Sequence, residues 1–228
     1  MSLNFKQGQL ILIDKEPNWT SFDVVNKIRS SIKKKLNIKK IKVGHAGTLD
    51  PLATGLLIIC CGKMTKSIDE FSLMNKTYTG KFILGSTTPS YDLETKPNIH
   101  YPVDHINEKL IFNTTKKFIG KILQKPPMFS AVKKDGVRLY KLARKGQKIK
   151  REKREIFINE FKITSVELPE ISFSISCSKG TYIRSIANDF GKELNSGAHL
   201  TELRRTKIGH YSVTVSYTHL RAHETLIY

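Results

Sequence analysis

Residues 44–66 read GHAGTLDPLATGLLIICCGKMTK, and they hold a single acid, Asp50, in a glycine-bearing loop that leads into an apolar run. Glycine reaches backbone angles that other residues rarely adopt, and Pro51 fixes the backbone angle directly after the acid. The loop can therefore aim the carboxylate, which is typical of a preorganised site. The glycines that we expect to serve it are Gly44, Gly47 and Gly55. The alternative is a structural loop in which Asp50 only caps the next turn.

The run Leu56–Cys61 directly after this loop is continuously apolar, which predicts a strand buried on both faces. Alternating or apolar segments predict four more strands, at Gln9–Asp14, Tyr78–Leu84, Ile156–Val166 and Ile171–Cys177. The last two are joined at Pro169.

Thr20 and Asp23 have the spacing of a capping box, which predicts the start of a helix over Ser21–Lys35. Its predicted buried face consists of Phe22, Val25, Ile28, Ile32 and Leu36. Two more helices are predicted at Asp104–Phe118 and Thr181–Leu194. Several strands with few helices and no regular βαβ rhythm predict an α+β fold, with a mixed, mostly antiparallel sheet flanked by helices.

The composition of the 228 residues, 39% of them hydrophobic, is that of one globular domain. The apolar runs are too short to span a bilayer and the N-terminus lacks a signal-peptide pattern, so we expect a cytoplasmic protein with no membrane partner. Three cysteines without zinc-site spacing predict buried thiols and no metal: Cys60, Cys61 and Cys177.

A formal net charge of +19 and a pI near 9.8 predict a polyanionic partner, because phosphates release counterions when basic side chains neutralise them. Eight Lys and Arg without an acid lie between Lys27 and Lys42, on the predicted helix and just beyond it. Fifteen lie between Lys116 and Arg154, against two acids. The alternative for either cluster is a solvated face in a lysine-rich protein.

Residues 124–153 carry most of the second cluster. The segment begins with two prolines after its first two residues, contains Gly136 and Gly146, and has one short amphipathic piece, Val137–Ala143. It has too few apolar residues for a core of its own, which predicts a basic arm inserted between sheet elements.

Five motifs, in order from Gln9 to Ser212, resemble the TruB family of RNA pseudouridine synthases. The stretch that begins at Gly44 is close to the family form GHxGTLDPxATGxL, and LILIDKEPNWTS at residues 10–21 resembles DKPxGxTS with Asn18 in place of glycine. Asn tolerates left-handed backbone angles best among non-glycine residues, so that turn can persist. The other three segments are KTY at 76–78, QKPPMFSAVKKDGVRLYKLARKG at 124–146 and CSKGTYIRSIANDFGKELNSGAHLTELRRTKIG at 177–209.

The resemblance implies the pseudouridine-synthase fold, with the arm as an RNA-gripping thumb. It implies an isomerase that flips a uridine out of the T-loop of tRNA, at position 55 in tRNA numbering, and converts it to pseudouridine as a monomer without a cofactor. Asp50 would be the catalytic carboxylate, acting either as nucleophile on ribose C1′ or as base at C2′. Arg184 would be its ion-pair partner, with a phosphate contact as the alternative.

The resemblance also implies roles for other side chains. Tyr78 would stack on the flipped base, while Tyr182 and Leu203 would line the pocket, with Tyr182 a candidate for proton transfer. His45 is either an RNA contact or a core histidine. The remaining expected RNA contacts are Lys15, Lys133, Arg138 and Arg144.

Residues 1–214 are therefore predicted to form the catalytic domain. The stretch VSYTHLRAHET within residues 215–228 resembles a translated transposase sequencing adapter, so we expect this tail to be non-native and the native C-terminal region to be missing. Two other functions stay open, a non-catalytic protein that binds and refolds tRNA, and a synthase for a different RNA.

Overall fold

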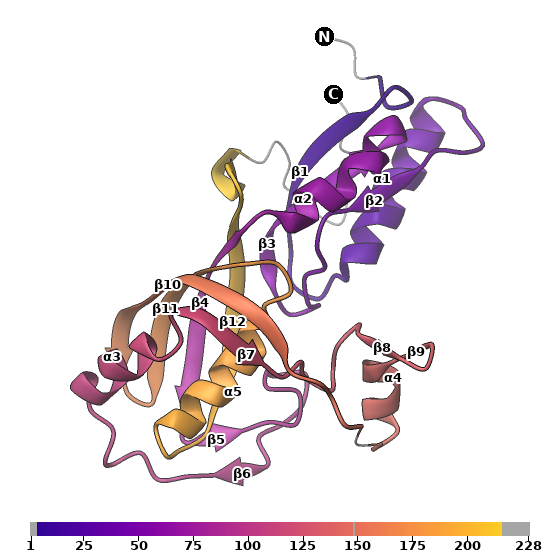
Figure 1. The fold of residues 1–228 in the computed structure, drawn as a ribbon. Helices are drawn as coiled ribbons and strands as arrows, with labels where there is room; N and C mark the ends of the chain where they lie inside the picture. Colours follow the sequence, from indigo (N-terminus) through magenta and orange to yellow (C-terminus); the bar gives the residue numbers. More distant parts are fainter. Residues whose placement is uncertain (1–3, 148, 216–228) are drawn as a thin grey trace. The chain divides into compact units, whose positions relative to one another are not determined.

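The computed structural model describes residues 4–147 and 149–215. The chain, expected to be one domain, divides into two compact units. Unit 1 comprises Met1–Tyr78 with Leu203–Tyr228, and unit 2 comprises Thr79–Glu202. The polypeptide passes from one to the other within β4 (Lys76–Leu84) and β12 (Ala198–Ile208). Figure 1 labels most of the helices and strands.

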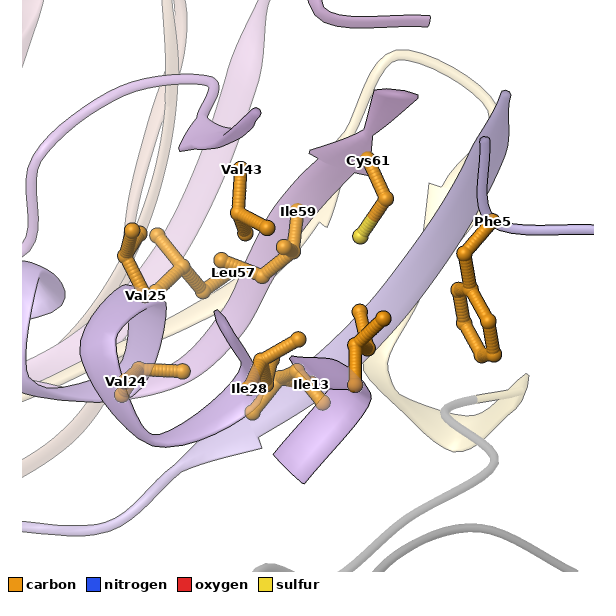
Figure 2. Close-up of a cluster of buried hydrophobic side chains, with 10 residues drawn as sticks. Phe5, Ile13, Val24, Val25, Ile28, Val43, Leu57, Ile59 and Cys61 are labelled. Atoms are coloured by element: carbon orange, nitrogen blue, oxygen red, sulfur yellow. The ribbon is translucent and has the colours of Figure 1, made fainter. Parts of the chain in front are cut away.

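Unit 1 is built on β3 (Thr54–Cys61), the predicted buried strand. It pairs antiparallel with β1 (Gln9–Lys15) and with β2 (Val43–His45), and parallel with β12. β13 (Tyr211–Ser212) extends β12. Alternate β3 residues enter two different hydrophobic clusters, because successive side chains point to opposite faces. Leu57, Ile59 and Cys61 enter the first, shown in Figure 2, and Leu56, Ile58 and Cys60 enter the second.

The first cluster is completed by α1 (Ser21–Lys35), whose predicted bounds and capping box are both confirmed. Its buried residues are Ser21, Val24, Val25, Ile28 and Ile32, whereas Phe22 is 58% and Leu36 38% exposed. The predicted buried face was wrong at these two residues. At about 100° per residue, Phe22 lies roughly a quarter turn from the centre of the buried stripe, and Leu36 is the C-cap. The second cluster packs against η1 (Gly62–Ser67) and α2 (Ile68–Leu73).

Unit 2 contains the strand order β12-β4-β11-β10-β7. β10 (Arg154–Glu167) forms a hairpin with β11 (Glu170–Cys177) around Pro169, and β7 (Gly120–Gln124) is the edge strand. Aromatic rings fill the core, with Phe82 of β4 4.2 Å from Phe173 of β11 between ring centroids. The mostly antiparallel mixed sheet with few helices confirms the predicted α+β class.

Two helices of unit 2 contribute to this core. Phe190 of α5 (Ile183–Glu193) packs 5.5 Å from Phe161 between ring centroids. α3 (Glu108–Lys116) begins four residues later than Asp104, because the Asn107 side chain accepts from the Leu110 N–H and caps it there. The short strands β5 (Ser86–Thr87) and β6 (Ile99–His100) pair separately.

The arm of residues 124–153 has the predicted character, with its central part mostly exposed. β8 (Lys133–Lys134) and β9 (Val137–Arg138) form a hairpin, and α4 (Leu139–Arg144) follows. Both turn residues have positive φ, 51° at Asp135 and 79° at Gly136, as a two-residue hairpin turn requires.

The described part of the chain ends with η2 (Val213–Val215). The predicted non-native tail therefore lies outside the described residues from position 216 onward. Among the helices in the described ranges, none combines the length and apolar character needed to cross a membrane.

Candidate active site

The loop between β2 and β3 holds Asp50, which is half-buried, in unit 1. The Ser21 side chain at the start of α1 clamps this loop, since its Oγ lies 2.8 Å from the Leu49 nitrogen and 3.2 Å from the Leu49 oxygen. On the other side of the acid, the Asn18 N–H donates to the Pro51 carbonyl at 2.8 Å. The backbone is thus fixed immediately before and after Asp50, as the sequence predicted for an aimed carboxylate.

Two of the three predicted glycines use the left-handed region, Gly47 with φ of 93° and Gly55 with φ of 100°. The prediction was wrong for Gly44, whose φ lies outside that region. Gly44 is needed for space, because an added Cβ would lie 2.6 Å from Ile68 Cδ1. Asn18 has φ of 66°, which confirms that asparagine supports the turn where the family form has glycine.

Lys15 lies at the end of β1, and only 1% of its surface is exposed. Its Nζ donates to the carbonyls of Glu16, Trp19 and Pro51 at 2.9, 2.8 and 3.2 Å. Burial lowers the pKa of Lys15 to about 8, although the nearby charge of Asp50 opposes the shift. An ammonium with three carbonyl acceptors joins β1 to the Asp50 loop. The expected RNA contact at Lys15 stays a prediction.

Arg205 of β12 is a second buried cation near this loop, and the sequence did not single it out. Its Nε donates to the Leu56 carbonyl at 2.7 Å and its Nη2 to the Gly47 carbonyl at 3.0 Å. The only available signal was its place in the motif at residues 177–209, directly after Leu203 and Arg204. Arginine is more often a surface residue, so this place did not indicate burial.

His45, the last residue of β2, is half-buried and lies opposite Ile59 of β3. Its buried Nδ1 has no hydrogen-bond partner among the residues that the structure describes. Burial, and secondarily the positive charge of Arg205, lower the pKa of His45. The ring is therefore neutral near pH 7, with one nitrogen lone pair or N–H left unused.

The two other predicted pocket residues of unit 1 lie on β4 and β12. Tyr78 is 8% exposed, and Leu203 is half-buried with its carbonyl 3.4 Å from Thr54 Oγ1.

The two neighbouring thiols at the end of β3, Cys60 and Cys61, are free and buried. Burial raises the pKa of Cys60 to about 11 and of Cys61 to about 12. Both are thus protonated thiols that pack as small apolar side chains.

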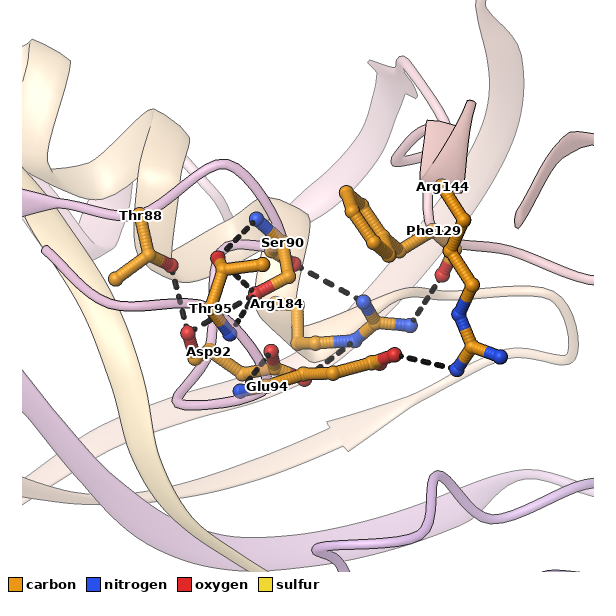
Figure 3. A network of polar contacts seen from close by, with 8 residues as sticks. All are labelled: Thr88, Ser90, Asp92, Glu94, Thr95, Phe129, Arg144 and Arg184. Atoms are coloured by element: carbon orange, nitrogen blue, oxygen red, sulfur yellow. Dashed lines mark hydrogen bonds and ion pairs between the residues drawn. The ribbon is translucent and has the colours of Figure 1, made fainter. Parts of the chain in front are cut away.

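Arg184, near the start of α5, is buried in a polar network of unit 2. Its Nε lies 3.4 Å from Asp92 Oδ2, its Nη1 donates to the Ser90 carbonyl at 3.0 Å and its Nη2 to the Phe129 carbonyl at 2.8 Å (Figure 3). One guanidinium therefore ties the base of the arm to the loop that follows β5. The sequence did not single out Asp92, because its role depends on Arg184, a partner 92 positions along the chain.

Tyr182 is the half-buried N-cap residue of α5. The amide side chain of Gln124 holds its backbone on both sides, since Oε1 accepts from the Tyr182 N–H at 2.8 Å and Nε2 donates to its carbonyl at 3.0 Å. Gln124 is also the last residue of β7, so the first residue of the arm sets where α5 begins.

The predicted RNA contacts on the arm are exposed. Lys133 and Arg138 face each other across the hairpin, with no acid beside them in that two-stranded ladder. Arg144 pairs instead with Glu94, with 2.8 Å between Nη2 and the carboxylate oxygen, and it lies 5.6 Å from the centroid of the Tyr140 ring. Lys133 and Arg138 are thus better placed for phosphates than Arg144.

Each unit therefore brings together a part of the predicted site. Unit 1 gathers Asp50, Lys15, His45 and Arg205 around one loop, and unit 2 gathers Arg184 and Tyr182 at the start of α5. The predicted ion pair of Asp50 with Arg184 would join the two units and stays a prediction.

Two family models match this chain. "TruB family pseudouridylate synthase (N terminal domain)" matches residues 33–183, and "tRNA pseudouridylate synthase B C-terminal domain" matches residues 184–226. Among curated proteins, tRNA pseudouridine synthase B of Flavobacterium johnsoniae is 60% identical over 210 residues, 92% of each chain. The protein of the same name from Phocaeicola vulgatus is 54% identical over 91% of this chain and 88% of its own length.

Among solved structures, a chain in the crystal structure of a Cbf5-Nop10-Gar1 complex is similar, with a TM-score of 0.67 and 30% identity. The alignment covers 91% of this chain and 50% of that one, so this chain spans about half the length of its solved relative. A chain of an H/ACA RNP bound to a substrate RNA containing 2′-deoxyuridine gives a TM-score of 0.63 at 27% identity.

Proposed function

The chain belongs to the TruB family of pseudouridylate synthases, and on this premise we propose that it isomerises uridine to pseudouridine in tRNA. The curated relatives at 60% and 54% identity carry the name tRNA pseudouridine synthase B. The observation that carries the proposal is the Asp50 loop, which is fixed on both sides of its one carboxylate. The specific target that we propose is the T-loop uridine at tRNA position 55.

The reaction needs a carboxylate beside the ribose. The bond between C1′ and N1 of uracil breaks, the detached base turns, and a bond forms between C1′ and C5. The C5 proton is lost and N1 gains a proton, so substrate and product are isomers and no electrons are exchanged. Asp50 acts either by attack on C1′ or by removal of a 2′ proton that is later returned.

The remaining site residues have supporting roles in this proposal. Tyr78 offers a ring on which the everted uracil stacks, and Tyr182 and Leu203 line the pocket. Arg184 pairs with the Asp50 carboxylate, and His45, neutral and with an unused Nδ1, contacts the RNA beside the target.

The basic surfaces supply the phosphate grip. In this proposal, the exposed cations of α1 and of the arm hold the T-arm of tRNA, with Lys133 and Arg138 of the hairpin as phosphate contacts. We further propose that the protein acts as a monomer in the cytoplasm, where tRNA is available and where buried free thiols such as Cys60 stay reduced.

The proposal is tested with an in vitro tRNA transcript that carries no other modification. We expect the wild-type protein to form pseudouridine in the T-loop, mapped by mass spectrometry, and Asp50→Asn to lower the rate by at least about 1,000-fold, the order expected for a group that acts directly on the reacting atoms. Asp69→Asn is the matched control, because Asp69 is an exposed acid on α2 of the same unit.

Three results would contradict parts of the proposal. If wild-type protein binds the transcript without forming pseudouridine, it is a tRNA-binding protein and not a synthase. If Asp50→Asn keeps full activity, the catalyst is another residue. Conversion of a uridine outside the T-loop alone would refute the proposed target.

A further inference from the structure

The loop that carries Asp50 is closed by one buried side chain, that of Arg205. Arg205 is 1% exposed, and two of its side-chain nitrogens donate to carbonyls on the two sides of Asp50, that of Gly47 near the start of the loop and that of Leu56 in β3. One guanidinium therefore joins the first part of the loop to the strand that follows it.

The main chain of Arg205 holds the loop at the same place. Arg205 pairs with Gly55 in the parallel ladder between β12 and β3. A Cβ on Gly55 would lie 2.3 Å from the Arg205 carbonyl oxygen, so the strands approach this closely only because residue 55 is glycine. This approach brings the guanidinium within reach of both carbonyls.

The burial of the positive charge of Arg205 costs free energy, which indicates that this side chain has a specific role. The hydrogen bonds that the structure gives Arg205 end on carbonyl oxygens, and among the described residues no carboxylate forms an ion pair with it. A buried cation without a carboxylate carries a desolvation penalty that an apolar side chain of similar size would not have. The rigid fork of an arginine, however, sets the separation of two acceptors more firmly than a lysine does.

We infer that Arg205 is a positioning residue for Asp50. It sets the width of the loop at its base and so sets where the carboxylate stands relative to the ribose of the substrate. The inference rests on the proposed function, because it takes Asp50 as the catalytic carboxylate. Arg205 itself does not touch the RNA, since it is buried beneath the loop.

The test compares Arg205→Lys with Arg204→Lys in single-turnover pseudouridine formation, with enzyme in excess over a tRNA transcript. Arg204 is the neighbour on the same strand, but its side chain is 41% exposed and pairs with Asp14. We expect Arg205→Lys to lower the rate constant at saturating enzyme by about 100-fold, as expected for a small misplacement of the reacting group. The Kd for the transcript and the rate of Arg204→Lys should stay at the wild-type values.

The saturating rate separates positioning from a general loss of structure. A smaller folded fraction raises the enzyme concentration needed for half-saturation and leaves the saturating rate constant unchanged, whereas a displaced carboxylate lowers that constant. A wild-type saturating rate in Arg205→Lys would overturn the inference. If Arg205→Lys shows no cooperative thermal transition, Arg205→Gln is measured in the same way, and failure of both to fold would also overturn it, since Arg205 would then be required for folding.

The wild-type protein keeps the two conclusions distinguishable. If it forms pseudouridine and Arg205→Lys is as fast, only the positioning inference fails. If it forms none, the proposed function fails, and the premise of this inference fails with it.

Discussion

Lys15 illustrates what burial does to a single charged residue near the site. Its ammonium has exchanged water for three carbonyl oxygens, and desolvation lowers its pKa to about 8. The shift makes the stability of unit 1 depend on pH above neutrality. Lys15 has a pKa of 10.5 in the unfolded chain, so there it keeps its proton up to a higher pH than in the folded protein.

We expect this dependence to vanish in Lys15→Met. Between pH 8 and 10.5 the unfolded state binds more protons than the folded state, so the free energy of unfolding of the wild type should rise with pH relative to the variant. This gain in the free energy of unfolding of the wild type over Lys15→Met is complete above the pKa of the unfolded state and is lost as pH falls through about 8. Its upper limit is about 3 kcal/mol.

Urea titrations at successive pH values measure this difference. Lys66→Met, at an exposed lysine of the same unit, is the control and should give a curve parallel to the wild type. A constant difference between wild type and Lys15→Met across that window would contradict the assigned pKa shift.

At the scale of elements, α1 links local sequence to the site. Thr20 and Asp23 close its first turn with reciprocal hydrogen bonds. Ser21, the residue directly after Thr20, accepts a hydrogen bond from the Leu49 N–H beside Asp50. Hydrogen bonds from Thr20 also lower the pKa of Asp23, so the cap is strongest when that carboxylate is ionised. A weakened cap should therefore loosen one of the attachments of the catalytic loop.

We expect Thr20→Ala to lower the free energy of unfolding by about 1 kcal/mol, the usual cost of a lost N-cap side chain. Ser30→Ala, at an exposed interior position of the same helix, should be neutral or stabilising by up to about 0.5 kcal/mol, because alanine is the better helix former. Urea denaturation measures both. Equal effects of the two substitutions would show that the capping box does not stabilise α1.

Elements with strong local signals were predictable from sequence, and those stabilised by distant contacts were not. The capping box and the apolar run of β3 gave nearly the observed bounds, since each depends on neighbouring residues. β12 was not predicted, because two adjacent arginines interrupt its apolar pattern, and the buried one, Arg205, has its hydrogen-bond acceptors in another segment.

Some residues of the site could likewise be identified from local sequence, and others could not. Asp50 could be identified from its loop, because the motif and the turn chemistry are local. Asp92 and Arg205 could not, because their roles depend on partners that the fold supplies: Arg184 lies 92 positions along the chain from Asp92, and Gly47 lies 158 from Arg205. Lys15 was identified, but its burial among carbonyls could not be seen in a sequence where lysine usually marks the surface.

For the whole molecule the dominant property is charge, with 39 Lys and Arg against 20 Asp and Glu. Such an excess favours a polyanion over any neutral partner, and it makes binding depend on ionic strength through counterion release. The exposed hairpin of the arm concentrates this charge without a neutralising acid across the ladder.

We expect the affinity for tRNA to fall steeply with salt, with a straight line when log K is plotted against log salt concentration. Lys133→Gln and Arg138→Gln should each reduce the magnitude of that slope by about 1, the effect of one lost phosphate contact. Filter binding at several salt concentrations measures the slopes.

Lys121→Gln serves as the control for this series. Lys121 on β7 is also exposed, but it pairs with Glu155, so its replacement should leave the slope near the wild-type value. If the slope is unchanged in both arm variants, Lys133 and Arg138 do not contact phosphates of the tRNA.

The two attachments of Arg205 have a consequence for how this segment can vary through insertion and deletion. Exposed side chains between Gly47 and Leu56, such as those of Thr48 and Leu52, can be exchanged while both carbonyls keep their places. An added or deleted residue, however, must either break one of the two hydrogen bonds of Arg205 or shift β3. A shift by one position would send every side chain of that strand into the opposite cluster. The architecture therefore holds constant the length of this segment, in addition to the glycine at position 55.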